Sequence, residues 1–223
     1  MCPLCSNPAI NFFTQTEKVN WQLYGKDPHQ EKELKFFQCQ TCELVFKDAK
    51  VHLSPILEKE RYLQHNNLFG DEKYEKFLSQ VVDSLVPKLA PNAEGLDYGC
   101  GSAAVMGELF QRKGYACDSY DPLFKNETRL LEKQYDFVSA CEVVEHFYSP
   151  AEGFQKLFSI LKNGAWLAVR TECPPAQFKT WWYHNDPTHV SFYSRKTFEW
   201  IANEFNAQLE FHSPEIVLFK KRF

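Results

Sequence analysis

Short apolar runs alternate with segments of helical spacing from residue 93 to residue 223. Runs at 95–98, 115–120, 135–141 and 166–171 predict strands, and the spacing over 103–113, 150–162 and 194–205 predicts helices. Asn163-Gly164 is expected to stop the second helix and Ser194 to cap the third. Two apolar runs within 209–219 predict a closing hairpin. This alternation is typical of an α/β fold with helices on both faces of a parallel sheet.

The first 92 residues follow a different pattern. Residues 53–90 are expected to be helical, with an apolar stripe from Tyr74 to Leu89 at i, i+3 and i+4. Within residues 1–50, aromatic and aliphatic side chains predict short strands. We therefore predict three parts: a module over 1–50, a helical linker or lid over 51–92, and an α/β domain over 93–223.

Composition narrows the class of protein. The chain has 223 residues, of which 44% are hydrophobic and 16% aromatic, so a folded core is expected. No apolar window approaches the ~18 residues of a membrane span, and the N-terminus does not have the pattern of a secretory signal, so we expect a cytoplasmic protein. The net charge of −4 does not favour a broad electropositive face for duplex nucleic acid.

Four of the eight cysteines form two C-x-x-C pairs. These are Cys2 with Cys5 and Cys39 with Cys42, and residues 6–38 separate the pairs. Such pairs are typical of a zinc-ribbon-like site with four thiolate ligands, and four protein ligands leave no open position for substrate, so the expected zinc is structural. The alternatives are unrelated buried thiols or a redox pair.

A glycine-rich turn follows the first predicted strand of the α/β domain. In Leu96-Asp97-Tyr98-Gly99-Cys100-Gly101, the glycines allow a sharp bend and close approach of a ligand. Asp121 ends the next strand about 20 residues later, where a carboxylate can accept hydrogen bonds from ribose hydroxyls. A tight turn without a ligand and a dinucleotide site are the alternatives.

These residues, together with Tyr135-Asp136-Phe137-Val138 and Leu161-Lys162-Asn163-Gly164-Ala165, resemble class I S-adenosylmethionine (SAM)-dependent methyltransferases. The resemblance implies a Rossmann-like sheet and SAM as cofactor. It also implies that Asp121 holds the ribose. Residues 122–135 are too few for the third strand of that family, which we expect to be vestigial. The cofactor-binding residues implied are Asp97, Gly99, Cys100, Gly101, Asp121, Pro122 and Glu142.

A second group of polar residues follows the third predicted strand. If 142–146 forms a helical turn, Glu142, Glu145 and His146 share one face, and we expect the later His189 to join them at the carboxyl edge of the sheet. The Glu-x-x-Glu-His pattern resembles ubiquinone-biosynthesis O-methyltransferases and small-RNA 2′-O-methyltransferases, which implies a Mg²⁺ or Mn²⁺ site. Alternatively, His189 or His146 acts as a base without metal, or the group is structural. The candidate catalytic residues are His189, Glu142 and His146.

Three functions remain open from the sequence. The first is a methyltransferase acting on a hydroxyl of a small molecule, with aromatic residues in 181–193 either stacking on the acceptor or packing in the core. The second is an RNA methyltransferase that docks nucleic acid on the zinc module. The third is a protein that binds the methyl donor without catalysis.

Overall fold

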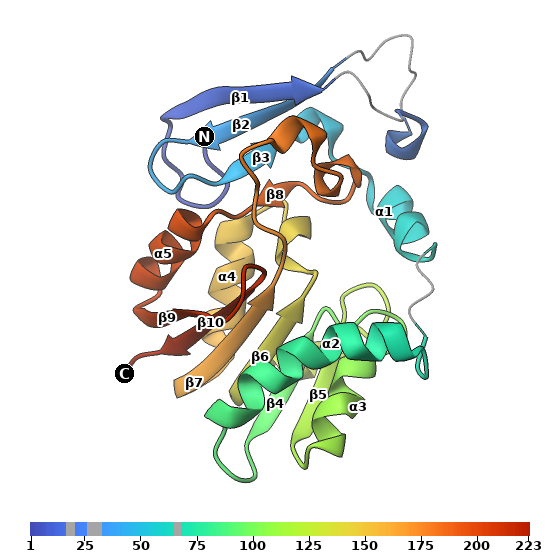
Figure 1. The fold of residues 1–223 in the computed structure, drawn as a ribbon, viewed down its shortest axis with the longest axis vertical. Helices are drawn as coiled ribbons and strands as arrows, with labels where there is room; N and C mark the ends of the chain where they lie inside the picture. Colours follow the sequence, from blue (N-terminus) through green and yellow to red (C-terminus); the bar gives the residue numbers. More distant parts are fainter. Residues whose placement is uncertain (17–20, 26–32, 65–67) are drawn as a thin grey trace. The chain divides into compact units, whose positions relative to one another are not determined.

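The computed structural model describes residues 1–223 except 17–20, 26–32 and 65–67. The chain divides into two compact units (Figure 1). Unit 1 comprises Met1–His65, Glu145–Glu152 and Glu172–Trp200, and unit 2 comprises Asn66–Val144, Gly153–Thr171 and Ile201–Phe223. Among the described residues, no helix is both long enough and apolar enough to cross a membrane.

A six-stranded sheet forms the centre of unit 2, in the order β5-β4-β6-β7-β10-β9. Strands β5, β4, β6 and β7 are parallel, whereas β10 is antiparallel to both β7 and β9. This arrangement confirms the predicted α/β sheet and its closing hairpin. The strands are β4 (Glu94–Tyr98), β5 (Ala116–Tyr120), β6 (Tyr135–Cys141), β7 (Leu161–Arg170), β9 (Ala207–Phe211) and β10 (Ile216–Lys221).

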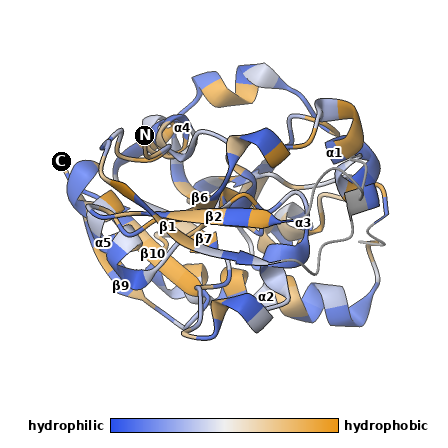
Figure 2. Cartoon of the chain, turned by 90° about the horizontal axis from the view of Figure 1, so that it is seen from above, coloured by the Kyte–Doolittle hydropathy of each residue, from blue (hydrophilic) through white to orange (hydrophobic). Residues whose placement is uncertain are grey.

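Helices cover both faces of this sheet because its strands present apolar side chains alternately to each side. Leu218 of β10 joins the core beneath α2 and α3, whereas its neighbour Phe219 contacts Phe154 and Phe158 of α4. Figure 2 shows the apolar character of β10 in orange. The helices are α2 (Glu72–Leu85), α3 (Val105–Arg112) and α4 (Pro150–Ser159), with 3₁₀ turns η3 (Val86–Lys88) and η4 (Thr128–Glu132).

The sheet departs from the sequence prediction at β7. The helix predicted over 150–162 ends at Ser159, and Leu161 already pairs with Tyr135 as part of β7. Gly164, expected to stop the helix, instead lies inside the strand with φ of +78°, where the register shifts between Tyr135 and Phe137. The glycine therefore allows a bulge rather than a helix end. The expected vestige of a third strand is confirmed, because only η4 lies between β5 and β6.

Unit 1 contains a four-stranded antiparallel sheet in the order β1-β2-β3-β8. The short strands predicted in residues 1–50 are present, but β8 comes from much later in the chain, so the sheet extends beyond the predicted 1–50 module. Its core includes Leu34, Phe36, Phe178 and Phe192. The elements are β1 (Ile10–Thr16), β2 (Leu34–Cys39), β3 (Val45–Lys47), β8 (Ser191–Phe192), α1 (Pro55–Tyr62), and 3₁₀ turns η1 (Trp21–Tyr24), η2 (Ala49–Val51), η5 (Val144–His146), η6 (Phe178–Thr180) and η7 (Tyr183–Asn185), of which η5 begins in unit 2.

Helix α5 (Arg195–Glu204) begins in unit 1 with the cap that the sequence predicts. The Thr197 amide donates to the Ser194 hydroxyl at 3.1 Å, and the Ser194 amide donates to the Thr197 hydroxyl at 3.2 Å. This reciprocal pair satisfies two backbone donors at the helix start.

Candidate functional site

The bend after β4 takes a backbone conformation that favours glycine. Gly99 and Gly101 have φ of +79° and +64°, and the amides of Gly99 and Cys100 both donate to the Tyr120 carbonyl oxygen. A Cβ at Gly99 would lie 2.4 Å from Val143 Cγ2, whereas a Cβ at Gly101 would meet no atom within 4 Å. A side chain at position 99 would therefore clash with Val143. At position 101 the left-handed backbone conformation favours glycine, and the space beside it is open.

Asp121 lies directly beside this bend. Its Oδ2 accepts a hydrogen bond from the Gly101 amide at 3.0 Å, and its Oδ1 accepts from the amides of Leu123 and Phe124 at 2.8 and 3.1 Å. A carboxylate has about four acceptor positions, so three amide donors leave room for about one further donor such as a hydroxyl. The structure therefore brings together Gly101 and Asp121 from two neighbouring strands, and Pro122 occupies the turn between Asp121 and Leu123.

Asp97, at the carboxyl end of β4, is the third polar group here. It is only 3% exposed, and its Oδ1 accepts from the Ser139 hydroxyl of β6 at 3.1 Å. Burial, opposed in part by the Ser139 hydrogen bond, raises the pKa of Asp97 to about 7, and the nearby Asp121 carboxylate adds to the rise. Two carboxyl groups therefore lie close together at one bend, and the charge of Asp121 raises the cost of ionising Asp97.

Glu142 follows β6 in a strained conformation, with φ of +53° for a residue that is not glycine. Its Oε1 accepts from Arg170 Nη1 at 2.5 Å, and the Arg170 guanidinium stacks over the Phe77 ring of α2 at 4.0 Å. The pKa of Tyr74, also in α2, is raised by burial and by the charges of Cys141, Asp97, Cys100 and Glu142.

Helix α2 therefore brings Tyr74 and Phe77 to the carboxyl edge of the sheet, near the bend residues. In the sequence, both residues belong to the apolar stripe of residues 74–89. The hydroxyl group of Tyr74 was the only feature of this stripe that could have indicated a place near the bend rather than in the core.

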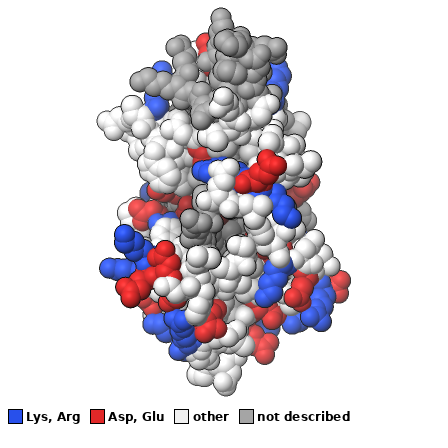
Figure 3. Space-filling model, turned by 90° about the vertical axis from the view of Figure 1, so that its right-hand side faces the viewer, with Lys and Arg blue, Asp and Glu red and all other residues white. Residues whose placement is uncertain are grey.

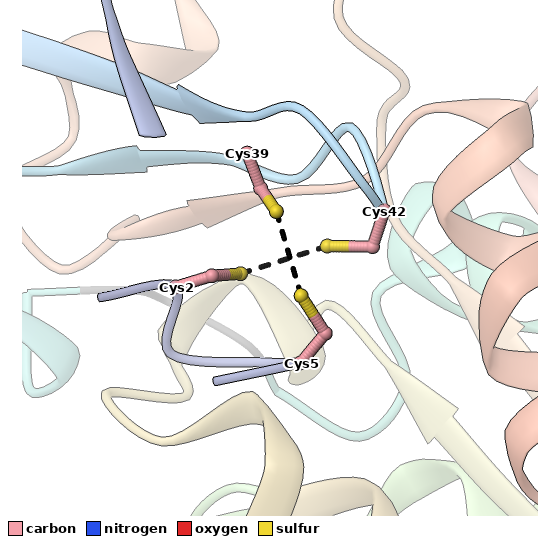
Figure 4. Close-up of side chains that lie close together, drawn as sticks. All are labelled: Cys2, Cys5, Cys39 and Cys42. Atoms are coloured by element: carbon pink, nitrogen blue, oxygen red, sulfur yellow. Dashed lines mark hydrogen bonds between the residues drawn. The ribbon is translucent and has the colours of Figure 1, made fainter. Parts of the chain in front are cut away.

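The four cysteines of unit 1 converge on one point (Figure 4). Their sulfurs all lie within 4.8 Å of one another, with Cys2–Cys42 at 3.5 Å and Cys5–Cys39 at 3.4 Å. These separations are too long for disulfides and close to the ~3.8 Å expected between thiolates around a tetrahedral zinc ion with Zn–S distances of about 2.3 Å.

The two C-x-x-C turns have the same backbone geometry. The Ser6 amide donates to the Cys2 carbonyl oxygen at 3.0 Å, and the Glu43 amide donates to the Cys39 carbonyl oxygen at 3.1 Å. Ser6 and Glu43 each follow the second cysteine of a pair, and both have φ of +57°. The residues present therefore fit a zinc ion, which Cys2, Cys5, Cys39 and Cys42 would hold.

A second group of ligand-type atoms in unit 1 comprises Glu145, His146 and His189, also within 4.8 Å of one another. Glu145 is fully buried and accepts at Oε1 from the Tyr183 hydroxyl at 2.5 Å. Burial, with the nearby His146, holds the pKa of His189 well below its ordinary value. Glu142 precedes the η5 turn and has a left-handed backbone conformation, with φ of +53°, so the single helical face expected for 142–146 does not form.

The aromatic residues predicted around this group form the core of unit 1. Tyr183, Phe192 and Tyr193 are buried, whereas Trp182 is 64% exposed. His184 stacks on Phe178. These contacts favour packing over acceptor stacking for most of the cluster.

Comparison with protein families gives one match of long extent. A profile described as a methyltransferase domain matches residues 71–210, which is more than half of the chain. Comparison with curated protein sequences finds no match.

Solved structures of similar fold include a SAM-dependent methyltransferase from Archaeoglobus fulgidus. It is 16% identical with a TM-score of 0.53, and the similarity covers 74% of this chain and 99% of that chain. A SAM-dependent methyltransferase from Methanosarcina mazei is 14% identical with a TM-score of 0.50, covering 63% of this chain and 97% of that chain. The fold is therefore Rossmann-like, and the family match includes the bend and all three carboxylates described in unit 2. This chain belongs to the methyltransferase domain family and is a SAM-dependent methyltransferase.

Proposed function

We propose that the protein transfers a methyl group from SAM to a hydroxyl group of a small molecule. The observation that carries the donor part of this proposal is the Gly99–Gly101 bend with Asp97 and Asp121 beside it. SAM supplies a methyl group on a positively charged sulfur and leaves as neutral S-adenosylhomocysteine. In the net reaction an O–CH₃ bond forms, the CH₃–S bond breaks, and its electron pair stays on sulfur.

The donor-binding residues proposed are those that the sequence indicated. Asp121 would accept from one ribose hydroxyl at the acceptor position left on its carboxylate, and Asp97 would face the cationic methionine part. Gly101 would leave space for the ligand. The amide hydrogen bonds to Asp121 support these roles, because they orient its carboxylate before a ligand binds. The full proposed set is Asp97, Gly99, Cys100, Gly101, Asp121, Pro122 and Glu142.

The proton of the acceptor hydroxyl needs a base, and we assign this role to His189, with His146 and Glu142 as further catalytic residues. Each of the two histidines has its Nδ1 at hydrogen-bond distance from a main-chain carbonyl oxygen, which only an N–H can satisfy. Nε2 of each neutral ring therefore carries a lone pair that can accept a proton. This arrangement supports general-base chemistry, which is matched to a hydroxyl acceptor.

The zinc module is proposed to be structural. Four thiolates complete a tetrahedral shell, so an ion held there has no position for an acceptor. We further propose that the acceptor is a small molecule rather than RNA. On the face shown in Figure 3, acidic and basic side chains are intermingled, which does not favour a phosphate backbone.

The experiment uses the full chain with SAM carrying an isotopically labelled methyl group. A panel of small hydroxyl, amine and thiol compounds and a sample of total RNA are offered separately, and S-adenosylhomocysteine and labelled products are measured by mass spectrometry. Label on an oxygen of a small compound, reduced in Asp121→Ala at limiting SAM concentration, is the expected result. Label on nitrogen, on sulfur or on RNA would contradict the proposed acceptor.

A further inference from the structure

We infer that Arg170 binds the carboxylate group at the amino acid end of the methyl donor. SAM and S-adenosylhomocysteine both end in an amino acid, which carries a negative carboxylate as well as a positive ammonium group. Asp97 and Asp121, the acids at the bend, suit positive groups and ribose hydroxyls, and neither pairs with a carboxylate. A guanidinium group matches a carboxylate in both charge and shape. The inference rests on the proposed donor site, to which it adds one residue.

Arg170 and Asp97 lie on the same face of the unit 2 sheet. Asp97 pairs in register with Ser139 of β6, and Ser139 pairs with Ala168 of β7. Arg170 comes two residues after Ala168 in β7. Because side chains alternate along a strand, all four residues project to one face. This face lies under α2, since the Arg170 guanidinium is 4.0 Å from the centre of the Phe77 ring.

The Arg170 side chain is also linked to the bend through the end of β6. Its Nη1 donates to Glu142 Oε1 at 2.5 Å, and its carbonyl oxygen accepts from the Glu142 amide at 2.9 Å. The next residue, Val143, is the one that a Cβ at Gly99 would touch. The guanidinium group is therefore two contacts away from the bend, and an extended ligand such as SAM can contact both.

The guanidinium group is held in place and has donors left over. Stacking on Phe77 and the hydrogen bond to Glu142 orient it, and the Arg170 side chain is only 11% exposed. A guanidinium has five N–H donors, and the bond from Nη1 to Glu142 uses one of them. Nε is buried and has no hydrogen-bond partner among the described residues. Such unmatched donors are unusual in a protein interior, and the pairing with Glu142 shows that a carboxylate fits against this group.

The test measures the calorimetric affinity of the full-length protein for S-adenosylhomocysteine and for its decarboxylated analogue, which keeps the ammonium group. The wild type should prefer S-adenosylhomocysteine, and Arg170→Met, which keeps an apolar stem against Phe77, should lose that preference. We expect this variant to bind S-adenosylhomocysteine about 10- to 150-fold more weakly, as for a lost charge-assisted hydrogen bond, and the analogue within about 2-fold of the wild type. Equal weakening of both ligands, or of neither, would overturn the inference, because a structural role alone does not distinguish them.

Arg112→Met is the matched control. Arg112 also pairs with a glutamate, Glu75, at 2.9 Å and lies over a phenylalanine ring, but it is in α3 and its side chain is 45% exposed. This variant should keep the wild-type preference, and an equal loss of preference would show that the effect is not specific to Arg170. Arg170→Gln carries the same test if circular dichroism shows that Arg170→Met is unfolded.

Asp121→Ala separates this inference from the proposed function. Because Asp121 is assigned to the ribose, its loss should weaken both ligands by the same factor. If neither ligand is weakened, the proposed donor site is wrong. If both are weakened in Asp121→Ala but the preference survives in Arg170→Met, only the assignment of Arg170 is wrong.

Discussion

Replacing Gly101 by alanine tests whether the Gly99–Gly101 bend binds the methyl donor. The structure allows the conformational cost of the alanine to be separated from its effect on ligand binding. Gly101 has φ of +64°, and a Cβ there meets no protein atom within 4 Å. The left-handed conformation costs a non-glycine residue about 1–2 kcal/mol, and no steric clash adds to it. A methyl group filling space that the donor occupies should cost a further 1–3 kcal/mol in binding, as in an overfilled cavity, or about 5- to 150-fold in affinity.

Gly114 provides the matched control. It follows Lys113, the C-cap of α3, with φ of +88°, and a Cβ there also meets no atom within 4 Å. Gly114→Ala should therefore lose about the same stability as Gly101→Ala, roughly 2–4 °C in Tm per kcal/mol for a chain of this size. Its affinity for S-adenosylhomocysteine should equal that of the wild type.

The assay combines thermal unfolding with calorimetric titration of S-adenosylhomocysteine into each variant. Similar Tm losses with weakened binding in Gly101→Ala alone are the expected outcome. Equal affinity in Gly101→Ala and wild type would refute the reasoning, because the donor would then not approach this glycine.

Three further predictions concern Asp121, Asp97 and the four-cysteine site. Asp121→Ala removes the acceptor of three amide donors and should weaken S-adenosylhomocysteine binding by ~1–3 kcal/mol in calorimetry; unchanged affinity would mean that the ribose lies elsewhere. The pKa of Asp97 rises from 3.8 to about 7 on folding, so the folded state holds the extra proton, and the contribution of this residue to stability should fall as pH rises from about 4 to about 7. Asp97→Asn should flatten that part of the denaturant-unfolding pH profile, and an identical profile would show that folding does not change the pKa of this carboxyl group. Cys39→Ser should reduce bound zinc, measured by mass spectrometry, from one ion per chain to none and lower the Tm; full zinc content would exclude the four-cysteine site.

Local patterns were enough to predict the sheet and the donor bend. A glycine pair after an apolar run and an acid about 20 residues on place Gly101 and Asp121 at the ends of adjacent parallel strands, because such strands end at one edge. The hydrogen bond between the Gly101 amide and Asp121 agrees with that reasoning. The two C-x-x-C pairs likewise predicted the convergence of their sulfurs from spacing alone.

Long-range contacts could not be predicted in the same way. The pairing of β8 with β3 joins Phe192 to Val45, and no local pattern marks a two-residue strand. Lys47 reads as a solvent-exposed charge but is 1% exposed, with its ammonium donating to the Asp186 carbonyl oxygen. Burial lowers the pKa of Lys47 to about 7. This burial arises from tertiary structure, so no local sequence pattern indicates it.

The predicted grouping of Glu142 with Glu145 depended on a regular helical turn. The left-handed conformation at Glu142 breaks that turn, and the partner that accommodates the side chain, Arg170, belongs to β7. Likewise, the tautomers of His146 and His189 are set by main-chain carbonyl groups of residues 183–189, which no sequence pattern indicates.

The most direct measurement is a crystal structure of the full chain with S-adenosylhomocysteine. The account predicts the nucleoside beside Gly101, with a ribose hydroxyl donating to Asp121 and its amino acid part facing Asp97. A ligand bound away from the Gly99–Gly101 turn, or density absent there at saturating concentration, would contradict it.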